Sequence, residues 1–316
     1  MRIVRTFTID CVGVMRFDDP SLLQMNHLGN KLSRLQVSTM AVMKMLVPKP
    51  VRDLVASQDL LWNLTLRELR GKYRRSFLGW TWSLLNPLAL VGIYWFVFSV
   101  VFGSQPPIGN PSGIKTYALY LLCALLPWSF FSLITGLGMS SLLGNGGLVR
   151  TVAFPRQTLV FAQSIFSLVQ FTIEMTLLTV ILLFAGSPLL HLLPLTVLQM
   201  LLLACFSTGI ALALSVMLVY FRDLTYLWTI INQVYFFMTP IIYDPSLLED
   251  KATPLIRSLL RWNPMSVFVD AFRHTMYDGR APAAANIAGL FAAAALSMAF
   301  GLLVFSRGVR RLAEEV

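Results

Sequence analysis

Residues 144–156 read GNGGLVRTVAFPR and separate two long apolar segments of the sequence. A short, basic interval with three glycines between such segments predicts a loop at a membrane surface. A helix end capped by Gly144 or Gly146, followed by a turn at Pro155, explains the same residues without any function. The choice between these interpretations depends on which side of the membrane the loop faces and on what surrounds it.

The composition predicts the class of protein. Hydrophobic residues make up 56% of the 316 residues and charged residues only 13%, which is far too apolar for a soluble domain of this length. The sequence therefore predicts an all-α, polytopic membrane protein. Three cysteines and three scattered histidines lack the spacing of a disulfide framework or a metal site. The phosphate-binding pattern G-x-x-x-x-G-K-[ST] is absent from the sequence, so any ATP would be hydrolysed by another chain.

Residues 1–50 are predicted to be a cytoplasmic extension. No apolar run of signal-peptide length follows their basic residues, and the cluster Met40, Met43 and Met45 leaves the true start of translation open. The next stretch, 53–70, predicts an amphipathic helix that lies in the membrane interface. Its arginines continue into 70–75, where they would face anionic headgroups.

Six apolar segments are long enough to cross about 30 Å of hydrocarbon, or nearly so. Orientation follows from the basic residues, because cytoplasmic segments are enriched in Lys and Arg. With the amino terminus inside, 19 of the 25 basic residues are cytoplasmic, so both termini and the 144–156 loop are predicted inside. The net charge of +10 is then a positive-inside bias and gives no reason to expect nucleic acid as a partner. The predicted spans are 80–103, 117–143, 158–186, 192–220, 226–243 and 285–306.

The third span carries a polar stripe with one carboxylate. Gln163, Ser167, Gln170 and Glu174 follow one another at steps of four, three and four residues, so they share one helix face. Such a face should point into the bundle or a wet cavity. Two roles remain open for Glu174, lining a transport path or making a structural hydrogen bond.

Small and aromatic residues recur in other spans. Small residues four apart predict close helix packing, and they are Ser207, Ala211 and Ser215 in the fourth span and Gly289, Ala293, Ser297 and Gly301 in the sixth. Aromatic residues are dense in the first and fifth spans, where belts at the two membrane interfaces are the default interpretation. Tyr94, Phe98, Tyr235 and Phe236 could instead line a sugar-conducting path.

Residues 244–284, on the outer side, alternate apolar and charged pieces and contain Pro245, Pro254 and Pro264. This pattern predicts two short amphipathic helices that dip into the outer interface before the sixth span.

Several motifs resemble one known family, the permease subunits of type-2 ABC exporters, and within it the polysaccharide and polyol-phosphate export group. That group includes O-antigen, capsule and teichoic acid export permeases. The resemblance covers the chain from about residue 53 to its end, with the motifs in family order. They are RELR at 67–70, KYRRSFLG at 72–79 leading into WSLLNP at 82–87, the loop 145–155, YFRDL at 220–224, MTPIIY at 238–243, and Asn263-Pro264-Met265 through Arg273.

The resemblance implies roles for individual segments within a transmembrane domain at 51–316. Residues 53–75 look like the interface helix that packs beside the ATPase, with Trp62, Arg67, Arg70 and Arg74 as its contact residues. Residues 144–157 look like the coupling segment, and 244–284 resemble re-entrant gate helices. The coupling residues implied are Leu148, Arg150, Phe154, Pro155 and Arg156.

The resemblance also implies partners and a mechanism. Family members are homodimers in the bacterial cytoplasmic membrane and bind two copies of a separate ATPase subunit, which holds the ATP and Mg²⁺. The chain itself would bind no cofactor or metal. ATP would close the ATPase dimer, move the coupling segments and open a path for a lipid-linked glycan.

Other functions fit less of the sequence. A drug or lipid exporter of the same superfamily is the nearest alternative, and the Asn-Pro and Arg-Asp motifs favour the glycan exporter over it. A membrane-embedded glycosyltransferase or acyltransferase would need convergent acids, a histidine or a metal cluster, which Glu174 alone does not supply. An ion-coupled transporter would show inverted repeats and paired interrupted helices.

Overall fold

The computed structural model describes residues 49–72, 81–103, 107–243 and 262–309. Every regular element within those ranges is helical, in agreement with the predicted all-α class. The chain divides into two units, residues 1–55 and 56–316. Helix α2 (Lys49–Ala56) lies almost entirely in the first unit, and all other described helices belong to the second.

Four helices of the second unit are long and apolar enough to cross a membrane, by their length and composition. They are α5 (Tyr117–Gly144), α7 (Gln157–Phe184), the 3-10 turn η3 (Leu189–Leu192) continuing into α8 (Leu193–Tyr220), and α13 (Ala284–Gly308). These match the predicted second, third, fourth and sixth spans to within about three residues, which confirms them as candidate spans.

The predicted first and fifth spans correspond to shorter helices. Helix α4 (Trp82–Tyr94) continues into the π-helix η2 (Trp95–Val101), and α9 (Leu224–Met238) has 15 residues. At about 1.5 Å per residue, α9 is roughly 22 Å long, which is less than the hydrocarbon thickness of a typical bilayer. The remaining described elements of this unit are α3 (Gln58–Lys72), α6 (Gly146–Thr151), α12 (Pro264–Phe272) and the π-helix η4 (Arg273–Asp278).

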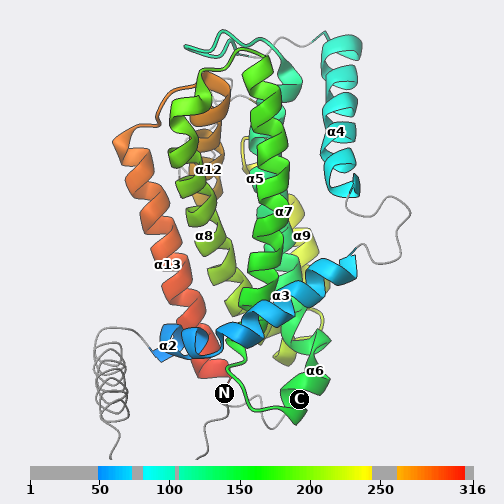
Figure 1. Ribbon diagram of the computed structural model, residues 1–316, viewed down its shortest axis with the longest axis vertical. Coiled ribbons are helices and arrows are strands. Elements are labelled where there is room, and N and C mark those ends of the chain that lie inside the picture. The colour runs from blue at the N-terminus through cyan, green and yellow to red at the C-terminus, as the bar shows by residue number, and fades with distance from the viewer. Residues whose placement is uncertain (1–48, 73–80, 104–106, 244–261, 310–316) are drawn as a thin grey trace, which may run out of the picture. The chain divides into compact units, whose positions relative to one another are not determined.

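Helix α5 is the centre of the second unit. It packs against both α7 and α8, and α8 packs in turn against α13 (Figure 1). In the most apolar window of α5, 83% of the residues are buried, whereas the corresponding share in α13 is 17%. Leu296 and Phe300 of α13 are 71% and 61% exposed, as expected for an apolar helix that contacts lipid on its outer face.

The α8–α13 contact depends on glycine. A Cβ on Gly301 would lie 2.7 Å from the carbonyl carbon of Gly209, and Ser297 donates a hydrogen bond to the carbonyl of Phe206 at 2.7 Å. The prediction of close packing by Ser297 and Gly301 is therefore confirmed. The residue that meets them is Gly209, which the stripe predicted in the fourth span did not include. From that stripe, Ala211 faces α5 instead, at Gly138.

The amphipathic helix predicted over 53–70 is divided. Helix α2 ends at Ala56 and α3 begins at Gln58, so the expectation of one continuous helix was wrong. The residue between them is Ser57, whose hydroxyl lies 3.1 Å from that of Thr158. Serine competes with helical hydrogen bonding through its side chain and favours helix ends, which accounts for a break at this position.

Candidate functional site

The polar stripe of α7 is buried, as its spacing predicts. Ser167 is fully buried, and Gln163 and Glu174 are only 9% and 8% exposed. Gln170, which is partly buried, donates a hydrogen bond from Nε2 to Oε1 of Glu174 at 3.0 Å. The stripe therefore turns away from lipid, as polar residues in a membrane helix should.

A cavity of about 140 Å³ lies between this stripe and α5. The fully buried hydroxyl of Ser167 has no hydrogen-bond partner among the described residues, and a polar cavity of this size has room for about four water molecules. We call this space the polar cavity; its lining residues are Ser129, Phe130, Leu133, Ser167, Gln170, Phe171 and Glu174. Three of the four predicted stripe residues thus line one cavity, whereas Gln163 is not among its lining residues.

Lys72, the last residue of α3, contacts the Gln170–Glu174 pair from outside α7. Its ammonium group donates to Oε1 of Gln170 and lies 5.3 Å from the ring centroid of Phe166. Partial burial lowers the pKa of Lys72 below its ordinary value, and the charge of Glu174 acts in the opposite direction. Lys72, Gln170 and Glu174 therefore form a connected chain of polar groups that runs from α3 into α7.

The predicted aromatic residues separate into two clusters. Phe98 packs against Tyr94 at 6.2 Å between ring centroids and stacks on Tyr117 at 4.5 Å. Tyr235 and Phe236 of α9 each lie 5.5 Å from the ring of Trp128. Tyr117 and Trp128 are both in α5, about 16 Å apart along the helix axis, so the structure does not bring the four predicted aromatic residues into one site.

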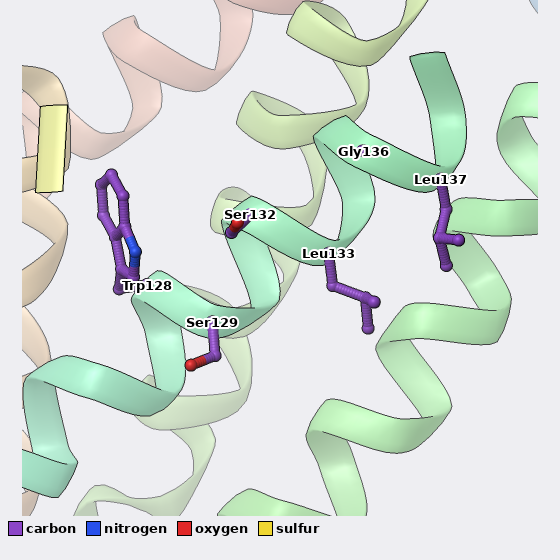
Figure 2. A pocket seen from close by; sticks show the side chains of 6 residues that line it. All are labelled: Trp128, Ser129, Ser132, Leu133, Gly136 and Leu137. Carbon is purple, nitrogen blue, oxygen red and sulfur yellow. The ribbon is translucent and has the colours of Figure 1, made fainter. Parts of the chain in front are cut away.

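An open groove on α5 lies between the polar cavity and the α9 aromatic residues. It has a volume of about 440 Å³, and Figure 2 shows that its lining residues follow one another along this helix. Ser129 and Leu133 line both the groove and the polar cavity, and Asn232 of α9 donates to the hydroxyl of Ser132 at 2.7 Å. The groove is lined by Trp128, Ser129, Ser132, Leu133, Gly136 and Leu137.

Sequence reasoning missed this face of α5. Its signal was a run of small residues, Ser129, Ser132, Gly136 and Ser140, spaced three or four apart in the second span. Pro127 lies inside α5 just before this run, where it cannot donate the usual helical hydrogen bond. The face therefore begins next to a residue where α5 lacks one backbone hydrogen bond. It lies between the polar cavity on one side and Tyr235 and Phe236 of α9 on the other.

The predicted coupling segment, residues 144–157, contains the short helix α6. Leu148 and Phe154 are partly buried and pack against the core of the second unit, whereas Arg150 is exposed. Pro155 is also partly buried, and Arg156 donates from Nη1 to the carbonyl of Val309 at 3.3 Å. The segment is thus anchored by two apolar residues and presents the charge of Arg150 to its surroundings.

The predicted interface helix contacts this segment directly. Nη2 of Arg67 donates to Oδ1 of Asn145 and to Oε1 of Glu68, each at 2.8 Å. Trp62 is 58% exposed and Arg70 is exposed, so both are available to a partner. Arg74 lies outside the described residues.

The segment predicted to lie on the outer side contains two buried polar residues that sequence reasoning did not select as site residues. Asn263 begins α12 by accepting from the Met265 amide at 2.9 Å, and its own amide donates to the Met238 carbonyl at 3.2 Å. Arg273 is only 6% exposed and donates to the carbonyls of Pro240 and Ile241, at 2.6 Å each. Together they join α12 and η4 to the turn after α9, so two of the recognised motifs form one structural unit. Of the two helices predicted here, the piece at 255–261 lies outside the described residues.

Comparison with known proteins agrees with this architecture. The sequence profile of the ABC-2 type transporter family matches residues 59–277. The O-antigen export system permease protein RfbA of Myxococcus xanthus is 30% identical over 270 residues, which is 84% of this chain and 98% of that protein. A permease of the same name from Klebsiella pneumoniae is 26% identical over 225 residues, covering 70% of this chain and 81% of the relative. A match over most of the described helices, with near full-length similarity to one relative, shows that this chain belongs to the ABC-2 type transporter family, as a membrane permease subunit.

Proposed function

We propose that this chain is the membrane-spanning subunit of an ATP-driven exporter that moves a lipid-linked cell-surface polysaccharide across the bacterial cytoplasmic membrane. The observation that carries the proposal is the near full-length similarity to an O-antigen export permease. The buried polar stripe of α7 and the polar cavity support it, because a soluble glycan needs hydroxyl and amide partners within the bilayer. O-antigen is the glycan that the relatives' names favour. A capsule polysaccharide, or a teichoic acid, which is a polyol-phosphate polymer, is the alternative cargo.

The permease would act as a homodimer with two copies of a separate ATPase subunit. We propose six spans with both termini in the cytoplasm. Four spans are the long helices, one is α4 together with η2, and one is α9. ATP and Mg²⁺ would be bound by the partner subunit. Closure of the ATPase dimer would push on the coupling segments, and the segment 244–284 would gate the outer side.

The first test is to identify what accompanies the protein. We expect a chain with the G-x-x-x-x-G-K-[ST] pattern to co-purify in near-equal amount after gentle extraction from native membranes, as mass spectrometry would show. Cells that lack the permease should accumulate lipid-linked glycan on the cytoplasmic side and lose it from their surface. Normal surface glycan in those cells, or extraction without an ATPase under several detergents, would contradict the proposal.

A second prediction concerns the coupling segment. Replacing Arg150 or Phe154 with Ala should reduce export about tenfold or more, because few residues carry most of the binding energy at an interface. The amount of protein in the membrane should stay close to that of the wild type, since Arg150 is exposed and Phe154 is only partly buried. Ser140→Ala is the matched control, because among the described residues this exposed serine bonds to the Gly136 carbonyl of its own helix and it is not among the residues that line the groove. Export at the wild-type rate by both variants would remove the coupling role from this segment.

A further inference from the structure

Helix α3 and the residue just before it make polar contacts at three points. Just before the helix begins, the hydroxyls of Ser57 and Thr158 are 3.1 Å apart. In its middle, Arg67 donates to Asn145 at 2.8 Å, and at its end Lys72 donates to Gln170. Figure 1 shows α3 running across α7 near α6.

The first two contacts lie at the two ends of the coupling segment. Asn145 is the residue between α5 and α6, and its own amide donates to the Ser141 carbonyl at 2.9 Å. Thr158 is fully buried near the start of α7, where the coupling segment ends. Hydrogen bonds to both ends of a loop oppose displacement of the helix relative to that loop, because moving either end would break one of them.

The third contact leads into the membrane. Gln170 lies 13 residues beyond Gln157, about 20 Å along α7, and it joins Lys72 to Glu174 at the polar cavity. Two routes therefore run from the coupling segment to the polar cavity. One is α7 itself, and the other is α3 through the ammonium group of Lys72.

We propose that α3 is a strap: it holds both ends of the coupling segment and transmits its displacement to the polar cavity through Lys72. Ser57, Arg67 and Lys72 are then positioning residues, which act on transport through Thr158, Asn145 and Gln170. This inference rests on the proposed function, because it gives a path for force that the ATPase would supply. It adds three contacts within this chain to the interface role that the resemblance implies for α3.

The strap makes a specific prediction for variants of the purified permease–ATPase complex. Arg67→Ala and Lys72→Met should each lower glycan export per ATP hydrolysed by about fivefold or more, the lower end of typical coupling between sites. For Lys72→Met, whose native ammonium group contacts Gln170 of the same chain, assembly with the ATPase and the rate of ATP hydrolysis should change little. Arg67 is also an implied ATPase contact, so Arg67→Ala is interpreted through the double variant described next. Lys72→Arg should restore most of the export, since it keeps a charged donor, and Asn63→Ala, an exposed residue of the same helix, should export normally.

A double variant separates the strap from direct contact with the ATPase. If Arg67 acts through Asn145, the pair Arg67→Ala with Asn145→Ala should export no less than Asn145→Ala alone. Additive losses would mean that Arg67 contacts the ATPase by itself, which overturns the strap at this point.

A disulfide tests whether α3 and the segment move together. Cysteines at 57 and 158, in a chain with Cys11 and Cys205 replaced by Ser, should form a bridge, because the two native hydroxyls are already adjacent. We expect the oxidised complex to export as well as the reduced one. Loss of export on oxidation, with recovery on reduction, would show that α3 slides against the segment and would overturn the proposal. A reduced complex that neither hydrolyses ATP nor exports would instead overturn the proposed function.

Discussion

Replacing Arg273 with Met should destabilise the permease by about 3 kcal/mol or more, because each hydrogen bond from a charged donor contributes about 1.5–3 kcal/mol. The buried guanidinium donates to two adjacent carbonyls, and its carbon lies 3.9 Å from the ring centroid of Tyr120. Methionine fills much of the space but leaves the carbonyls of Pro240 and Ile241 without this donor. In detergent, the midpoint of thermal unfolding should fall by about 6 °C or more.

Lysine at this position should not rescue the protein. Its ammonium group is a single point charge and cannot present two parallel N–H groups to adjacent carbonyls, or stack on a ring as a planar guanidinium does. Arg280→Met is the matched control, because the side chain of Arg280 is 52% exposed and bonds only at 3.3 Å to Asp278. We call the two hydrogen bonds from Arg273 to the Pro240 and Ile241 carbonyls the clamp. An unchanged unfolding midpoint for Arg273→Met, measured beside that control, would show that the clamp does not stabilise the contact of η4 with the turn after α9.

Substitution of Gly301 should separate α13 from α8. A Cβ at this position would lie 2.7 Å from the carbonyl carbon of Gly209 and 2.8 Å from its Cα. These are backbone atoms, so they cannot rotate away, and the helices would have to move apart along their whole contact. Gly301→Val should therefore cost about 3 kcal/mol, at the upper end of the range for overpacking, and lower the yield of folded protein in the membrane.

The same helix provides a control for this prediction. A Cβ at Gly289 would meet its nearest neighbour, Val267, at an ordinary 3.7 Å. Gly289→Ala should leave the unfolding midpoint unchanged or raise it slightly, because alanine is the better helix former. Equal behaviour of Gly301→Val and Gly289→Ala, as judged by size-exclusion profiles after heating, would contradict the close approach at Gly301.

The strap and the clamp act at opposite ends of the spans. Arg67 and Asn145 fasten α3 to the coupling segment, whereas Arg273 fastens η4 to the turn after α9. Both contacts join separate elements and both are made by an arginine, but only Arg273 donates from both of its terminal nitrogens. Loss of the clamp should therefore act on stability and loss of the strap on coupling, which the two sets of variants would separate.

The sequence by itself determined the class of protein and most of its helices. Long apolar runs predict spans directly, because the bilayer requires about 20 apolar residues with their backbone bonds satisfied internally. The polar stripe of α7 was also predicted, since helical spacing alone puts Ser167, Gln170 and Glu174 on one face. The motifs around 67–87 and 238–273 were sufficient to indicate the family that the comparisons then showed.

Which helix faces meet depends on packing between distant parts of the chain. The spacing of small residues in the fourth span pointed to Ser207, Ala211 and Ser215, yet the residue that contacts Gly301 is Gly209. The sequence around Gly209 does not distinguish it from the other small residues of α8. That helix is apolar on all sides, so its rotation about its own axis depends on the helices that pack against it. For the same reason, the α5 face at Ser129 and Ser132, the clamp at Arg273 and the contact of Arg67 with Asn145 could not be predicted. Each of these three features includes a hydrogen bond between residues that are distant in the sequence. Such bonds depend on how the helices pack, which the spacing of residues within one helix does not reveal.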